Sequence, residues 1–253
     1  MLIHKRRSGQ PQGVAKLRSE LGFDSFILPG VGSDLVTGAP VIFGTGETLT
    51  QNAYGKTLRA AANTATSGAW TIPDASAFPL ATTQATVLIA GKNVTNEGNG
   101  AFGLGTVGGS DSNNLHALIP YLDGVVYFAF GGNTEGSTRL SKAGLTFSYN
   151  DVWVFTSGPR GMEIWQNGVL VASNSASPTR TNNTNAFGIR GATFDTKTDP
   201  FDCLAFGYSR RQMPKEICQS LSRDLWGTAF VQRRRGIIAG IAAAARRRVV
   251  FWG

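Results

Sequence analysis

Residues 152–173 read VWVFTSGPRGMEIWQNGVLVAS, and this stretch decides the fold. It holds three short runs rich in β-branched and aromatic side chains, a composition typical of β-strands: Val152–Thr156, Met162–Gln166 and Val169–Ser173. Asn167 and Gly168 separate the last two runs. A two-residue type I′ turn requires positive φ at both central positions, which Asn and Gly tolerate best. The stretch therefore predicts an antiparallel hairpin.

Runs of the same kind recur on both sides of this hairpin, each bounded by turn residues. They are Val41–Phe43, Ala69–Ile72, Thr86–Ala90, Ala101–Val107, Ala117–Leu122, Val125–Phe130, Leu145–Tyr149, Ala186–Arg190 and Cys203–Ser209. Their steady spacing indicates an all-β sandwich or barrel, and strand and helix patterns do not alternate as in βαβ units. Asp123 and Gly124 lie between two of the runs and predict a second type I′ hairpin.

One helix is predicted, over about residues 214–226. Pro214 suits the first helical position, where its missing N–H is not needed. Glu216 lies in the first turn, which favours the helix dipole. An apolar residue recurs every four positions at Ile217, Leu221 and Leu225. Trp226-Gly227 is predicted to end the helix, which we expect to cap the sandwich.

Composition bounds the class of protein. Of the 253 residues, 16% are charged and 32 are glycines, so the chain is poor in charge and rich in turn residues. The aromatic and β-branched content excludes intrinsic disorder. Gly236–Ala245 is far shorter than the roughly 20 apolar residues that a spanning helix needs, so no membrane insertion is predicted. Met1–Gly13 lacks the apolar core of a secretory signal, which predicts synthesis in a reducing cytoplasm.

Charge divides the chain into three parts. Residues 1–20 hold five basic side chains and one acidic one, and residues 205–253 hold ten basic and two acidic ones. The residues between hold nine basic and thirteen acidic side chains. This asymmetry predicts a basic N-terminal arm over 1–22, a mildly acidic sandwich domain over 23–230, and an Arg-rich apolar arm over 231–253.

The C-terminal arm has three interpretations: an amphipathic segment on a membrane surface, a nucleic-acid arm, or a segment that docks on acidic protein. Small Ala and Gly side chains bury little apolar area, which makes a poor membrane anchor. We favour docking on protein, with nucleic acid the less favoured partner. The predicted docking residues are Lys5, Arg6, Arg7, Arg233, Arg234, Arg235, Arg246, Arg247 and Arg248.

The sequence lacks the usual signs of catalysis. Its two histidines, His4 and His116, are more than a hundred residues apart, and no Gly-x-Ser-x-Gly elbow accompanies them. Glycan hydrolysis needs two carboxyl groups roughly 5–10 Å apart, yet the hairpin offers Glu163 alone. A cluster of loop acids lacks a partner base: Asp195, Asp199 and Asp202. We therefore predict no enzyme and no cofactor; calcium is unsupported, because the acids form no spaced ligand ladder.

Sugar binding has one candidate pair in the hairpin. An exposed aromatic ring can stack on a sugar while Asn side chains supply hydrogen bonds, and Trp165 with Asn167 at the turn would suit this. The alternative is that Trp165 fills the space between sheets, where aromatic side chains of strands normally lie. Cys203 and Cys218 are predicted to be small buried hydrophobes without a disulfide framework.

Three stretches resemble concanavalin A-like, laminin-G-like domains. They are the hairpin 162–173, the run FDCLAFGYSR at 201–210, and the segment QMPKEICQSLSRDLW at 212–226. The last resembles the terminal helix of that family at Glu216, Ile217, Leu221 and Trp226. It departs where Met213 replaces a Ser cap and Leu225 replaces Pro. The pattern covers residues 23–230, and its specific motifs lie within 150–226.

The resemblance implies a two-sheet antiparallel jelly roll. Such domains, followed by an Arg-rich apolar tail, are common among virion proteins of tailed bacteriophages. The resemblance therefore implies a structural virion protein, made in the host cytoplasm, that is tail-associated or decorates the capsid. It would dock through its arms to other virion proteins, be present in several copies, and offer its sandwich to host-surface glycan. The alternatives are a stand-alone lectin and, third, a glycan-cleaving jelly-roll enzyme.

Overall fold

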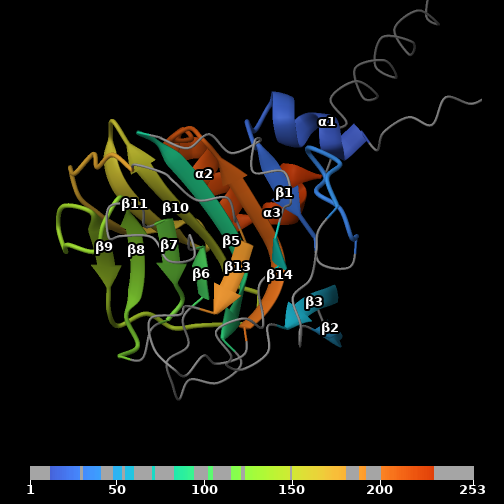
Figure 1. Ribbon diagram of the computed structural model, residues 1–253, viewed down its shortest axis with the longest axis horizontal. Coiled ribbons are helices and arrows are strands. Elements are labelled where there is room, and N and C mark those ends of the chain that lie inside the picture. The colour runs from blue at the N-terminus through green and yellow to red at the C-terminus, as the bar shows by residue number, and fades with distance from the viewer. Residues whose placement is uncertain are drawn as a thin grey trace, which may run out of the picture.

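A computed structural model describes residues 12–28, 31–40, 48–52, 55–59, 70–71, 83–93, 102–104, 115–120, 123–148, 150–180, 188–191 and 201–230. Within these ranges the named strands pair antiparallel throughout. They form two facing layers, as predicted for a jelly-roll-like β-sandwich (Figure 1).

The first layer is one large sheet. Its strand order is β12 (Val169–Ser173), β11 (Gly161–Gln166), β10 (Val152–Gly158), β5 (Ala85–Asn93), β14 (Phe201–Ser209), β3 (Gly55–Arg59) and β2 (Thr48–Asn52), and β1 (Ser25–Ile27) also pairs with β14.

The second layer consists of two three-stranded sheets. One has the order β7 (Leu115–Leu118), β8 (Val126–Phe130), β9 (Arg139–Lys142). The other has the order β4 (Trp70–Thr71), β13 (Gly188–Gly191), β6 (Phe102–Leu104). Strand β6 lies beside β7, so the two sheets continue one another across the large sheet (Figure 1).

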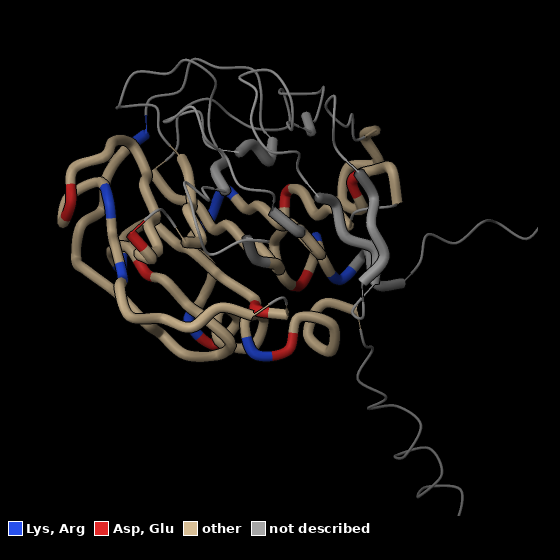
Figure 2. The backbone as a smooth tube through the Cα atoms, turned by 90° about the horizontal axis from the view of Figure 1, so that it is seen from below, with Lys and Arg blue, Asp and Glu red and all other residues tan. Residues whose placement is uncertain are grey.

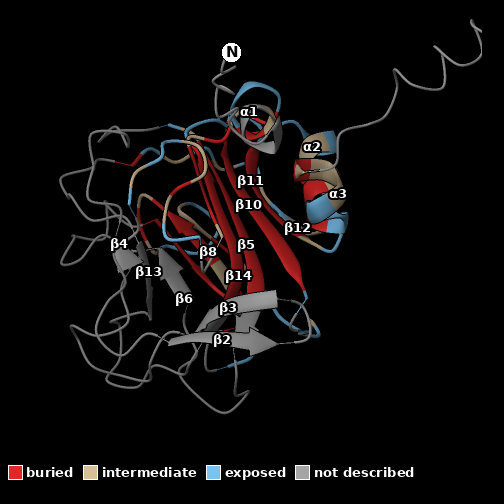
Figure 3. Cartoon of the chain, turned by 90° about the vertical axis from the view of Figure 1, so that its right-hand side faces the viewer, coloured by how far each residue is buried: buried red, intermediate tan, exposed pale blue. Residues whose placement is uncertain are grey.

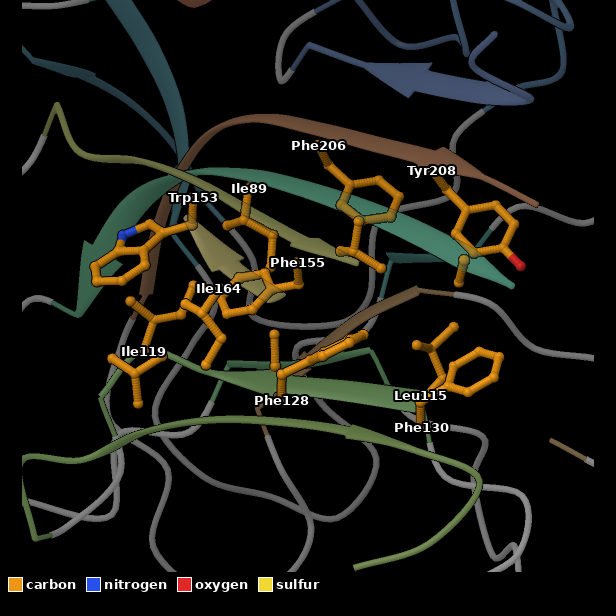
Figure 4. Close-up of a cluster of buried hydrophobic side chains, with 14 of the residues drawn as sticks. Ile89, Leu115, Ile119, Phe128, Phe130, Trp153, Phe155, Ile164, Phe206 and Tyr208 are labelled. Carbon is orange, nitrogen blue, oxygen red and sulfur yellow. The ribbon is translucent and has the colours of Figure 1, made fainter. Parts of the chain in front are cut away.

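A hydrophobic core fills the space between the two layers. Alternate side chains of β10, Trp153 and Phe155, point into it, and their rings stack at 6.2 Å between centroids. Phe128 of β8 meets Phe155 from the opposite layer at 5.5 Å (Figure 4). Both cysteines are buried thiols, and Cys203 belongs to this core.

A second core covers the other face of the large sheet. Helices α2 (Lys215–Arg223) and α3 (Leu225–Ala229) lie against that face (Figure 3). Val152 and Val154 of β10 point into this core, opposite to Trp153 and Phe155. Strand β10 is therefore buried on both faces, which explains why its sequence is an almost continuous apolar run.

The N-terminal boundary of the folded body is not the predicted one. Helix α1 (Gln12–Ser19) precedes residue 23, and its Leu17 is 0% exposed within the second core. Leu21, just beyond the end of α1, is buried in the same cluster, and its N–H donates back to Lys16 O at 3.1 Å. Residues 12–22, predicted as part of a basic arm, thus belong to the body. Residues 1–11 and the predicted arm 231–253 lie outside the described ranges.

The Asn167-Gly168 turn is confirmed and the Asp123-Gly124 turn is wrong. Asn167 has φ 50°, Gly168 has φ 87°, and Gln166 pairs directly with Val169. In the second hairpin Leu118 pairs with Tyr127, so the connection is much longer than two residues. Asp123 accepts a hydrogen bond from Val125 N at 2.9 Å through its Oδ1, which makes a side-chain-stabilised turn instead.

The predicted helix is two helices. Asp224, with φ −147° and ψ 80°, ends α2 and begins α3, because its Oδ1 accepts from Gly227 N at 2.9 Å. Trp226-Gly227 therefore lies inside a helix and does not end one. Pro214 is the residue that precedes α2. None of the described helices is long and apolar enough to cross a bilayer.

Most predicted strands are present, and the unpredicted ones are either polar or, like β1, only three residues long. Residues 145–148 are not a strand, and Val41–Phe43 lies outside the described ranges. The strands that apolar runs did not reveal are β1, β2, β3 and β9; β9, for example, reads RLSK.

Leu17→Ala should lower the free energy of unfolding by about 2–5 kcal/mol, because it leaves a cavity under α1. Urea unfolding measures the change. Arg18→Ala, which truncates the exposed neighbour, is the control and should change stability by less than about 0.5 kcal/mol. Equal values for the two variants would contradict the packing of α1 on the body.

Candidate functional site

Trp165 cannot serve as a sugar platform. Its side chain is 5% exposed and lies in the core beneath the helices, and its Nε1 donates to Glu163 Oε2 at 3.2 Å. Sugar stacking on Trp165 would require an exposed ring, and helices cover this face of β11. Trp165 is buried, as the alternative interpretation requires, but it packs between the large sheet and the helices and not in the space between the two sheets.

Asn167 is exposed, but its amide already holds the turn. Its Nδ2 donates to Asp151 Oδ1 at 2.8 Å, and its Oδ1 accepts from Val152 N at 2.9 Å. Asp151 also accepts from Gln166 Nε2 at 3.0 Å. These bonds fix the end of the hairpin. A role for Asn167 in glycan binding stays a prediction.

Glu163 is the centre of a buried polar cluster. It is 1% exposed and receives hydrogen bonds from Thr156 and Trp165. Arg160 Nη2 and Lys215 Nζ each lie 3.5 Å from one of its oxygens. Arg160 Nη2 also donates to Met213 O at 2.6 Å. Through Met213 and Lys215, the cluster connects the hairpin to the start of α2, so its contacts stabilise the fold.

A different set of polar groups lies on the outer face of β8 and β9. Strand alternation sends Val126 and Phe128 into the core, and leaves Tyr127 facing outward. Tyr127 stands opposite Ser141, and Ala129 stands opposite Arg139. We call the group Asp123, Tyr127, Glu135, Arg139 and Ser141 the polar–aromatic face.

The members of the polar–aromatic face contact one another. The Arg139 guanidinium lies 4.8 Å from the Tyr127 ring centroid, a cation–π arrangement. Arg139 Nε donates to Glu135 Oε2 at 3.0 Å, and Ser141 Oγ donates to Glu135 Oε1 at 2.8 Å. The Tyr127 hydroxyl donates to Asp123 Oδ2 at 2.7 Å. The side chains of Arg139 and Glu135 remain 34% and 47% exposed.

The loop before β9 is tightly built. Thr134 O accepts from the N–H groups of Thr138 and Arg139 at 2.9 and 3.0 Å. A Cβ added to Gly131 would lie 2.4 Å from Thr179 O, and one added to Gly132 would lie 2.6 Å from a Thr138 oxygen. Only glycine fits so close an approach, so the loop that carries Glu135 has a defined conformation.

Electrostatics define the protonation states on this face. Burial raises the pKa of Tyr127 to about 12, and the hydrogen bond to Asp123 adds to the shift. The phenol therefore stays protonated and acts as a donor, not a nucleophile. Burial lowers the pKa of His116 to about 4, and the positive charge of Arg139 adds to that shift. His116, opposite Ala129 in the sheet, is therefore neutral near pH 7.

Sequence reasoning missed this face. Tyr127 lies in the predicted run Val125–Phe130, but β9 was not predicted, so Arg139 and Ser141 had no assigned position. The i,i+4 spacing of Glu135 and Arg139 was the available signal. The predicted docking residues lie outside the described ranges: Lys5, Arg6, Arg7, Arg233, Arg234, Arg235, Arg246, Arg247 and Arg248.

Other surface features are more dispersed. Along the described backbone, acidic and basic residues are interspersed (Figure 2). Trp226 on α3 is 45% exposed and stacks on Phe230 at 5.8 Å. In the part of the chain that the structure describes, no three His, Cys, Asp or Glu residues are grouped to hold a metal ion.

Comparison with known proteins gives the fold. No family model and no curated protein matches the sequence. Among solved structures, the binding domain of Paraclostridial Mosquitocidal Protein 1 is similar with a TM-score of 0.57 and 12% identity, over 81% of this chain and 52% of that one. The chain thus spans about half of that domain's length. This likeness defines a β-sandwich.

Two further structures share the sandwich. One is a botulinum neurotoxin type C structure, with a TM-score of 0.52 and 15% identity over 80% of this chain and 51% of that one; its cell entry depends on interaction with two ganglioside molecules. The other is a Trypanosoma rangeli sialidase, with a TM-score of 0.55 and 13% identity over 81% of this chain and 33% of that one. The sandwich thus occurs in toxin structures and in about a third of a sialidase chain.

The buried neutral His116 should make the fold acid-sensitive. The unfolded chain binds a proton here below about pH 6.5, but the folded chain does so only near pH 4, so stability present above this window is lost as pH falls through it. Between pH 7 and 4.5, His116→Gln should lose about 2 kcal/mol less free energy of unfolding than the wild type. Urea titrations at both pH values measure this. Equal losses in the two proteins would contradict the lowered pKa.

Proposed function

We propose that the sandwich is a glycan-binding module and that the polar–aromatic face is its contact surface. The observation that carries this proposal is the half-exposed network of Arg139, Glu135 and Tyr127, in which every group is held by another. Sugars present vicinal hydroxyls and apolar C–H patches, and fixed donors, acceptors and a flat ring complement both. The ring and the guanidinium are ordered before any ligand arrives, which lowers the entropy cost of binding.

The structural comparisons support glycan binding as an analogy of fold. The similar toxin structures are described as binding domains, and the botulinum type C toxin interacts with gangliosides. A fold alone does not carry a function. The proposal of glycan binding therefore rests on the residues of the polar–aromatic face, and the structural comparisons add support to it.

We favour binding over cleavage, although a third of a sialidase chain has a similar fold. The pKa of Tyr127 is raised, which disfavours an attacking phenolate. Asp123 accepts two hydrogen bonds and Glu135 accepts two, so both carboxylates serve the network. Glu163, the acid of the hairpin, is buried beneath α2.

The finer proposal is that this module belongs to the virion of a tailed phage. It rests on the resemblance of the hairpin and terminal helix to such proteins, and on the basic segments at both ends. A stand-alone lectin is the second candidate, favoured by α1, which packs on its own sandwich through Leu17. Incorporation into particles distinguishes the two.

Tyr127→Ala should weaken glycan binding at least tenfold, because it removes the ring and the support of Arg139. A glycan array identifies the ligand, and calorimetry measures the affinity of each variant. Trp226→Ala, which truncates an exposed aromatic elsewhere, is the matched control. A loss confined to Trp226→Ala would place the site on α3, and no glycan bound by the wild type would reject the proposal.

Replacing Arg233–Arg235 and Arg246–Arg248 by Ser should abolish incorporation into particles, since charge-assisted contacts to acidic neighbours would be lost. Thermal unfolding should change little, because the substitutions lie beyond α3. Quantitative blotting of purified particles measures incorporation. Unchanged incorporation would reject docking through these residues and leave the stand-alone lectin.

A further inference from the structure

We propose that Arg139 selects glycans that carry a carboxylate, by offering both terminal nitrogens of its guanidinium to the two carboxylate oxygens. This inference rests on the proposed function and names the class of ligand. Fork-like pairing of guanidinium and carboxylate is a strong, directional interaction that a neutral sugar cannot form.

The first step is the hydrogen-bond inventory of Arg139. Its Nε is used by Glu135 Oε2 at 3.0 Å. Within the described ranges, neither terminal nitrogen donates to a protein acceptor. The Arg139 side chain is 34% exposed, so part of it meets solvent. We call the edge formed by its two terminal nitrogens the outer edge. The two terminal nitrogens carry four N–H groups, and two of these point outward along their shared edge, which can pair with the two oxygens of a carboxylate.

The second step is that the guanidinium is fixed in position. The Tyr127 ring supports one of its faces at 4.8 Å from the centroid, and Glu135 holds Nε. Glu135 is itself held by Ser141 Oγ at 2.8 Å. The backbone of Arg139 is tied to the loop through Thr134 O and Gly136 N, at 3.0 and 2.9 Å. An ordinary surface arginine loses the rotational freedom of several side-chain bonds when it binds a ligand. The contacts of Arg139 already restrict this freedom, so the entropy cost of binding is smaller.

The third step concerns the charges around the guanidinium. Glu135 and Asp123 oppose an incoming anion, while Arg139 attracts it. Neutral His116 adds no charge near pH 7. The acids touch Nε and the phenol, and no described acid touches the outer edge. Recognition is therefore set by the direction of the donors, and removal of the Glu135 charge should strengthen it.

Matched ligands separate charge from shape. The probes are 3′-sialyllactose and tri-galacturonic acid, each compared by calorimetry with its own methyl ester, together with the acidic and neutral hits of the array. The wild type should bind at least one acid about tenfold more tightly than its ester. Arg139→Gln should remove this preference, and Arg139→Lys should reduce it, because an ammonium keeps the charge but lacks the fork.

Two other variants sharpen the result. Glu135→Gln keeps an acceptor for Nε and removes a negative charge, so the ratio of acid affinity to ester affinity should rise severalfold. Arg210→Gln, which breaks the exposed pair of Arg210 with Asp24 at 2.8 Å, is the control and should leave the preference unchanged. Thermal unfolding checks that each variant is folded.

The outcomes distinguish the two proposals. Equal binding of acids and esters, or a preference that survives in Arg139→Gln, overturns the carboxylate inference and leaves glycan binding intact. Displacement of the acid by equimolar inorganic phosphate assigns the site to anions in general and also overturns it. The absence of any bound glycan rejects the proposed function itself.

Discussion

Burial of the large sheet on both faces is the constraint on which the rest of the structure depends. Strands β5, β10 and β14 separate two hydrophobic cores, one against the smaller sheets and one against the helices. Val154 and Phe155 are neighbours in sequence but belong to different cores. Because each residue has a fixed side, a shift of one position in β10 would exchange the two cores, and the register is strongly specified.

This double burial also decides where function can lie. The side chains of β10 and most of β11 are committed to packing or to the Glu163 cluster, and helices cover Trp165. On the outer face of β8 and β9, by contrast, several side chains are not used for packing. There Tyr127, Arg139 and Glu135 are half-exposed or exposed. The Tyr127 hydroxyl, the Glu135 carboxylate and Arg139 Nε have partners within the polar–aromatic face.

Burial also explains which parts of the fold and of the site could be predicted from the sequence. Buried strands reveal themselves by apolar runs, and Asn167-Gly168 by its chemistry, so the fold class and the central hairpin were predictable. Strand β9, with the sequence RLSK, has one face in solvent and no such signal. The polar–aromatic face depends on its pairing with β8, a contact between strands that no local pattern encodes. The sequence left open whether Trp165 is exposed or buried, because its position beside the turn does not reveal that helices cover it.

The Asn174 side chain joins the two layers at the end that carries Glu135. Its Nδ2 donates to Gly136 O at 3.4 Å, while its Oδ1 accepts from Met162 N at 3.2 Å in the large sheet. Through these two hydrogen bonds, Asn174 holds the loop beside the polar–aromatic face in a fixed position relative to the large sheet. A rigid small surface of this kind cannot wrap around a polymer, so each site gains only a modest contact area. Firm attachment to a cell would then come from many copies engaging at once, with avidity set by their spacing.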